Sequence, residues 1–188
     1  MSVARLHQGF TLIEVLIAIV IFAIGLLGIA GLQIAGMRFT HGSQLRSAGT
    51  MQAESMADLM RANEFGVRNG FYNVTTSMPT SFPTDCSTTV CDAQARATFD
   101  LVTWNQTTTG QPQQSNAEVL PLGVGVVCRD ATPNDGNASN WACDDNGNVY
   151  AIKLQWQERS VRADDAGGAD VQNQVFIMTV LPALDEMP

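Results

Sequence analysis

An apolar run over residues 10–37 constrains this chain more than any other part of its sequence. A bilayer core needs roughly 20 apolar residues in helical form, so the run is long enough to cross a membrane. Glu14 is its only charged residue, and no Lys or Arg lies between Arg5 and Arg38. A charge inside a membrane helix costs on the order of 2.5–3.5 kcal/mol on insertion scales. We therefore expect the Glu14 carboxylate to find its partner outside the run.

A short motif at the start of the run resembles the type III signal sequence of type IV pilins and pseudopilins: Gly9-Phe10-Thr11-Leu12-Ile13-Glu14. The resemblance implies that a prepilin peptidase cuts between Gly9 and Phe10 on the cytoplasmic side. It also implies methylation of the new N-terminus at Phe10. The helix would stay attached to the body, with Glu14 as the fifth mature residue. Arg5 gives the short leader a positive charge, which favours its retention in the cytoplasm.

An ordinary secretory signal and a plain single-span anchor are the alternative interpretations. Residues 28–30 have the small-x-small pattern of a cleavage site. However, the apolar region of an ordinary signal is about 7–15 residues long and carries no acidic group. The length of this run and the presence of Glu14 favour the pilin-like signal over both alternatives.

A second helical segment, residues 38–62, continues the apolar run without an intervening proline. Apolar side chains recur in it at the spacing of one helical face; they are Leu45, Ala48, Met56 and Leu59. Asn63 and Gly66 are typical stop signals near its end. We predict one long helix with a cleaved leader (1–9), a membrane or fibre-core half (10–37) and an amphipathic half (38–62).

Residues 63–188 are expected to form a globular α+β body in the periplasm. Within them, residues 93–104 are interpreted as a short helix rather than a strand. Three later segments show strand patterns, and turn-forming residues separate them; the segments are 123–128, 149–157 and 175–181. We predict an antiparallel sheet with one face covered by the amphipathic half of the long helix, which together make a pilin-like α+β fold.

Two of these strand segments carry a prediction about their faces. Residues 149–157 alternate between an apolar row and a more polar row that contains Lys153; the apolar row is Tyr150, Ile152, Leu154 and Trp156. Residues 175–181 are apolar on both faces, which is typical of a strand that is covered on both sides.

Four cysteines predict two disulfides if the body lies in an oxidising compartment. Each proposed pair brackets one local loop, so we predict Cys86–Cys91 and Cys128–Cys143. A loop of about 15 residues gains roughly 3 kcal/mol from such a bridge. Zinc is the competing interpretation, but the spacings are not those of paired Cys-x-x-Cys knuckles. We expect disulfides and no metal.

The sequence contains no His-Glu-x-x-His, Gly-x-Ser-x-Gly or Walker motif. His7 belongs to the leader, and His41 stands alone near the membrane boundary. Residues 144–148 faintly resemble a calcium loop but lack its full alternation and final Glu, so a turn is favoured. A net charge of −8 without a basic block argues against nucleic-acid binding. We expect no enzymatic activity and no cofactor.

Further segments are similar to the PilV group of minor type IV pilins; they are residues 25–33 and 57–63, a Cys pair before the segment 100–104, and residues 120–123 ahead of a Val-rich strand. The resemblance implies a subunit that starts fibre assembly near the tip, beside other minor and major pilins and an adhesin. Such a subunit sits in the inner membrane before assembly and in the surface fibre afterwards, where it supports adhesion or twitching motility. A polar insertion, residues 107–117, departs from this pattern.

Two other functions remain open at this point. A minor pseudopilin of a type II secretion system has the same kind of N-terminus and fold. A membrane-tethered periplasmic binding module would need converging polar groups in a concave site, and the sequence shows no such cluster. Within one chain, Glu14 and the Phe10 amine can pair partially. In a growing fibre, Glu14 is expected to pair instead with the Phe10 amine of a neighbouring subunit, as the resemblance also implies, and to fix helix register. The alternative is that Glu14 only serves recognition by the peptidase or methylase.

Overall fold

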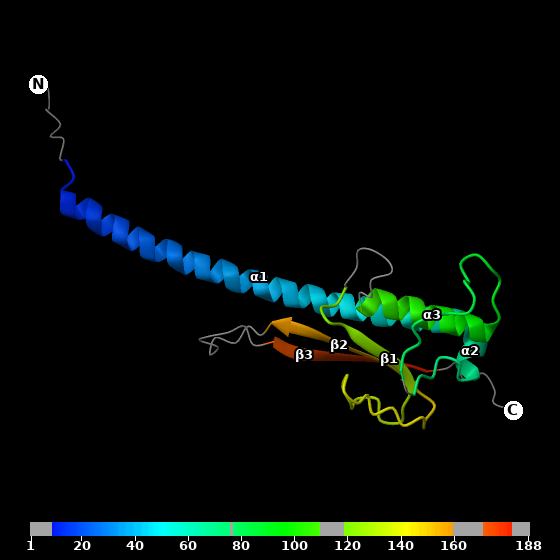
Figure 1. The fold of residues 1–188 in the computed structure, drawn as a ribbon. Helices are drawn as coiled ribbons and strands as arrows, with labels where there is room; N and C mark the ends of the chain where they lie inside the picture. Colours follow the sequence, from blue (N-terminus) through cyan, green and yellow to red (C-terminus); the bar gives the residue numbers. More distant parts are fainter. Residues whose placement is uncertain (1–8, 76, 110–118, 160–170, 182–188) are drawn as a thin grey trace, which may run out of the picture. The chain divides into compact units, whose positions relative to one another are not determined.

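The structure is a computed structural model that describes residues 9–75, 77–109, 119–159 and 171–181. Its elements follow the order α1 (Leu12–Ala62), α2 (Glu64–Arg68), α3 (Ala93–Thr109), β1 (Val124–Arg129), β2 (Tyr150–Arg159) and β3 (Val171–Val180) (Figure 1). The chain divides into two compact units, Met1–His41 and Gly42–Pro188. The predicted leader falls outside the described residues except for Gly9.

The first unit consists of the N-terminal part of α1. An 18-residue window of this helix has a mean hydropathy of 3.0, and none of that window is buried within the chain. Among the described residues, α1 alone is long and apolar enough to cross a membrane. Its large side chains are exposed, with Leu32 at 76% and Phe22 at 68%. An apolar surface of this kind marks a contact with a membrane or with another protein.

The part of α1 that belongs to the second unit buries one face. The buried side chains recur every three or four residues, as an amphipathic helix requires; they are Gly42, Leu45, Gly49, Ala53, Met56, Ala57 and Met60. The predicted stripe is therefore correct, with Ala48 and Leu59 at its half-buried margin. The helix ends one residue before Asn63, whose side chain accepts a hydrogen bond from Gly66 N–H at 3.2 Å and caps α2.

The sheet has the order β1-β2-β3, and both neighbouring pairs are antiparallel. Ile152 lies opposite Val127 in β1 and opposite Met178 in β3. This agrees with the predicted fold class: a long N-terminal helix packs on a three-stranded antiparallel sheet beside disulfide-bonded loops. The segment predicted as a helix over 93–104 is helical and extends to Thr109.

The core lies between the sheet and the two longer helices, which cover the same face of it (Figure 1). Trp104 of α3 donates its indole N–H to the carbonyl of Gln52 in α1, over 2.8 Å. On β2, the predicted apolar row is fully or almost fully buried. Trp156 from this row packs against Gly49 of α1. Both helices are thus tied to the middle of the sheet.

One strand prediction is wrong in detail, and one face of the sheet is covered where the sequence made no prediction. The more polar row of β2 is not open to solvent, because the chain between β1 and β2 folds over it and buries Lys153 completely. β3 is not covered on both sides: on the face that it shares with Lys153, Val171 is 50% and Val175 is 42% exposed. β3 also starts at Val171, before the predicted segment 175–181.

Candidate functional site

The bond between Gly9 and Phe10 lies in irregular, exposed backbone just before α1. The carbonyl of Thr11 accepts hydrogen bonds from Glu14 N–H at 3.1 Å and Val15 N–H at 3.3 Å, so the helix begins immediately after Thr11. Phe10 is 83% exposed. A peptidase needs backbone that is free of helical hydrogen bonds, and this bond offers it.

Glu14 occupies the third position of the helix, in its first turn. Thr11 and Glu14 have the spacing of a capping box, in which a Thr at the N-cap precedes a Glu by three residues. We missed this signal in the sequence. A carboxylate in the first turn also interacts favourably with the positive end of the helix dipole. Among the described residues, Glu14 forms no ion pair, so its charge is available to another chain.

Phe10 and Glu14 lie along one side of the helix with Ala18 and Phe22, at steps of four residues. They line a shallow, almost wholly apolar groove on the first unit. Glu14 is the single charged group in the lining. This surface can pack against another apolar helix and present one carboxylate to it.

Comparison with known families identifies this segment. Residues 4–30 match the family model described as "Prokaryotic N-terminal methylation motif". No curated protein and no solved structure gives a significant match.

The match supports a prepilin signal of the type IV pilin and pseudopilin class. A signal of this class implies processing by a prepilin peptidase, attachment to the membrane before assembly, and assembly with other pilins. Pilins of this class are structural proteins rather than enzymes. The matched residues include all three positions that the sequence singled out, Gly9, Phe10 and Glu14.

The cysteines of the second unit form two local disulfides. Cys86 is bonded to Cys91, and Cys128 is bonded to Cys143. The structure therefore brings together the same pairs that the sequence predicts. The carboxylate of Asp130 lies close to the second pair, within 4.8 Å. Both sulfurs are bonded to each other, so they are not available as thiolate ligands for zinc.

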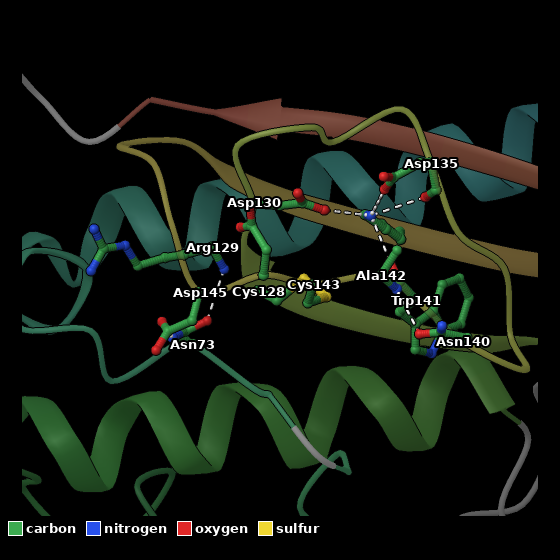
Figure 2. Close-up of a disulfide and its surroundings, with 12 residues drawn as sticks. Asn73, Cys128, Arg129, Asp130, Asp135, Asn140, Trp141, Ala142, Cys143 and Asp145 are labelled. Atoms are coloured by element: carbon green, nitrogen blue, oxygen red, sulfur yellow. Dashed lines mark hydrogen bonds and ion pairs between the residues drawn. A yellow bond between two sulfur atoms is a disulfide. The ribbon is translucent and has the colours of Figure 1, made fainter.

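A buried lysine pairs with Asp130, the carboxylate that lies beside the second disulfide; Figure 2 shows Asp130 with Cys128 and Cys143. Lys153 and Asp130 both have fully buried side chains, and Lys153 Nζ lies 2.6 Å from Asp130 Oδ2. The same ammonium contacts Asp135 Oδ1 at 3.2 Å and donates to the carbonyls of Asp135 and Trp141 at 3.0 and 2.7 Å. These four contacts hold the chain between β1 and β2 against the sheet.

Thr132 completes this cluster. Its hydroxyl donates to Asp135, and that hydrogen bond, followed by the one from Lys153, lowers the pKa of the Asp135 carboxyl. The sequence predicts Lys153 in the polar row of a strand but does not predict its burial. The available signal was a lysine between apolar strand residues, with four Asp in the preceding loop, of which Asp130 and Asp135 contact it.

A second polar network joins α3 to the end of α1. Tyr72 donates its hydroxyl to Asp100 Oδ2 over 2.6 Å, and Arg96 Nε lies 3.2 Å from Asp100 Oδ1. Burial raises the pKa of Asp100, while the Tyr72 hydrogen bond and the Arg96 charge oppose that rise. The Asn63 amide donates to Tyr72 Oη and to the Ala93 carbonyl. Every group has a partner, so the network is structural.

The two remaining candidates from the sequence do not form a catalytic group. His41 is exposed and has no partner among the described residues. In the loop over 144–148, Asp144 Oδ1 accepts hydrogen bonds from the backbone N–H of Ala131 and Asn146. These bonds lower the pKa of the Asp144 carboxyl, the Asn146 bond most. The loop is a hydrogen-bonded turn.

Proposed function

We propose that this chain is a minor type IV pilin of the PilV type. The observation that carries the proposal is a prepilin motif placed directly before an apolar helix that continues into a disulfide-bonded α+β body. The helix enters the initiation complex at the fibre tip beside other minor and major pilins. The body carries the contacts to neighbouring subunits and to a tip adhesin, in support of pilus biogenesis, adhesion and motility.

Processing is the first step of this proposal. The prepilin peptidase cuts between Gly9 and Phe10, and Phe10 is methylated. Before assembly the subunit crosses the inner membrane once, with its body in the periplasm. The exposed, irregular backbone around the bond supports this site. Mass spectrometry of the mature N-terminus tests it, with methyl-Phe10 as the expected result. A mature chain that begins at residue 31 would contradict the proposal.

Glu14 then fixes the register of the assembled helix. Cleavage turns the backbone nitrogen of Phe10 into an α-amine. In a fibre, the Glu14 carboxylate of one subunit pairs with that amine on its neighbour. Surrounding apolar helices strengthen the attraction because they lower the local dielectric, although desolvation offsets much of the gain. The pairing therefore acts mainly by selecting one alignment of helices that otherwise slide freely.

A minor pseudopilin of a type II secretion system is the second candidate, because the matched motif is common to both assemblies. Deletion of the gene separates the two. If the chain is a pilus subunit, its deletion is expected to abolish surface pili and twitching and to leave secretion of exoproteins unchanged. Loss of secretion with normal piliation would assign the chain to the secretion system instead.

A further inference from the structure

The stretch of α1 that follows the apolar run is locally basic. The chain has 18 Asp and Glu in total, yet none lies between Glu14 and Glu54. Arg38 and Arg46 fall in this interval, with His41 between them. In a chain of net charge −8, this interval is where an anionic surface meets least repulsion.

The two arginines have different surroundings. Arg46 belongs to the second unit, and its Nε lies 3.6 Å from Glu158 Oε2. Arg38 and His41 belong to the first unit, are exposed, and form no ion pair or hydrogen bond through their side chains within the described residues. They are three residues apart, so they lie on the same side of the helix. Arg38 and His41 are therefore free to bind a group from outside the chain.

The length of the helix places Arg38 at the membrane surface, given the membrane insertion that the proposed function includes. Twenty-eight residues lead from Phe10 to Arg38, and at about 1.5 Å per residue they span about 42 Å. A bilayer with its headgroup regions is about 40–45 Å thick. When Phe10 lies among the cytoplasmic headgroups, Arg38 lies among the periplasmic ones.

The side chains beside Arg38 fit this depth. Met37 is 65% exposed and Phe39 is 64% exposed. Exposed apolar side chains on either side of a cation suit the boundary between the hydrocarbon layer and the headgroups. The Arg stem can lie along the apolar layer while its guanidinium reaches the headgroups.

We propose that Arg38 and His41 bind the phosphate of an anionic phospholipid in the periplasmic leaflet of the inner membrane. The planar guanidinium of Arg38 offers two parallel N–H donors to a phosphate, and the His41 imidazole adds another donor. The bound lipid holds the unassembled subunit at a fixed depth. It is released when the helix leaves the membrane for the fibre.

The test uses the full mature chain in nanodiscs made of equal parts phosphatidylcholine and phosphatidylglycerol. After release into mild detergent, native mass spectrometry counts the lipids that each protein retains. Wild type is expected to retain phosphatidylglycerol in preference. An Arg38→Gln/His41→Gln variant should retain less, by about fivefold for loss of one cation near an anionic surface.

Arg61→Gln is the matched control, because Arg61 lies on the same helix but is paired with Asp58 at 2.5 Å. Its lipid retention should equal that of wild type. Equal retention of both lipids by wild type, or unchanged phosphatidylglycerol retention in the double variant, overturns the inference. Carbonate extraction distinguishes failure of the lipid-binding inference from failure of the proposed function. A chain released by carbonate contradicts membrane insertion itself, whereas an inserted chain without lipid preference contradicts only the lipid site.

Discussion

The ammonium of Lys153 lies 2.6 Å from Asp130 Oδ2, and neither side chain has any exposed surface. Asp130 directly follows β1, whereas Lys153 lies in the middle of β2. The ion pair therefore fastens the start of the loop between these strands onto the sheet. The Asp135 carboxylate and two backbone carbonyls, from Asp135 and Trp141, complete the coordination of the ammonium.

Loss of this lysine should be strongly destabilising. Lys153→Ala leaves the Asp130 carboxylate buried without its partner and two carbonyls without a donor. Removal of one member of a buried pair typically costs about 3–5 kcal/mol in the free energy of unfolding. Chemical denaturation of the full chain in detergent measures the change.

Arg61→Ala serves as the comparison for Lys153→Ala, because it breaks an exposed pair with Asp58 on the same protein. Exposed pairs contribute about 0–1 kcal/mol, so this variant should stay close to wild type. Equal effects of the two substitutions would show that the buried pair does not anchor the loop.

The local elements of this fold were predictable because their signals are local. The spacing of Leu45 and Met56 indicated one face of a helix, and the alternation from Tyr150 to Trp156 indicated a strand. Each disulfide closes a short stretch of chain, so proximity in sequence was enough to suggest the pairs. The prepilin motif could be recognised for the same reason, because it consists of adjacent residues.

The burial of Lys153 was not predictable in the same way. It depends on a loop of the chain that returns over the sheet, which neither strand pattern nor composition encodes. The exposure of Val175 has a similar cause. An apolar strand is covered on both sides only if other parts of the chain pack on both faces of the sheet. Val175 lies opposite Gln155, on the face that points away from Trp156 and the helices. Both features depend on neighbours that are distant in sequence.

A second prediction concerns the contact between Gly125 in β1 and Trp104 in α3. A Cβ added at Gly125 would lie 2.6 Å from Trp104 Cη2 and 2.9 Å from Leu154 Cδ2. Gly125→Ala forces both side chains to move, and overpacking of this kind costs about 1–3 kcal/mol. Thermal unfolding measures the loss.

Gly36→Ala is the control for Gly125→Ala, because a Cβ at this helical position meets nothing within 4 Å. It should leave stability unchanged or raise it slightly, as Ala favours helix over Gly by up to about 1 kcal/mol. A Gly125→Ala protein as stable as wild type would mean that the ring of Trp104 has room to move.

The two disulfides should differ in their contribution to stability. Cys128 and Cys143 are 15 residues apart, whereas Cys86 and Cys91 are five apart. In the chain-entropy model, the bridges across these loops add about 3 and about 2 kcal/mol, respectively, to the free energy of unfolding. Replacement of each pair by serine, followed by denaturation, tests the order. A larger loss from the Cys86–Cys91 pair would contradict it.

The last prediction concerns Glu14 and tests the assembly mechanism. Glu14→Ala removes the only carboxylate in the apolar part of α1 but leaves Gly9, Phe10 and the helix intact. The variant should still be cleaved and methylated. It should enter fibres less, by about tenfold if the pair contributes roughly 1.4 kcal/mol. Quantitative immunoblotting of sheared fibres and of membranes measures how much of the subunit is in each fraction.

Glu14→Asp tests whether the length of the side chain matters when its charge is kept. Its shorter side chain keeps the negative charge, so partial incorporation is expected where the carboxylate still meets the neighbouring amine. Glu14→Gln keeps the length without the charge and should resemble Glu14→Ala. If the Ala variant is processed, methylated and found in fibres at the wild-type level, Glu14 does not set the register between subunits. A failure of cleavage in all three variants would instead identify Glu14 as a recognition element for the peptidase.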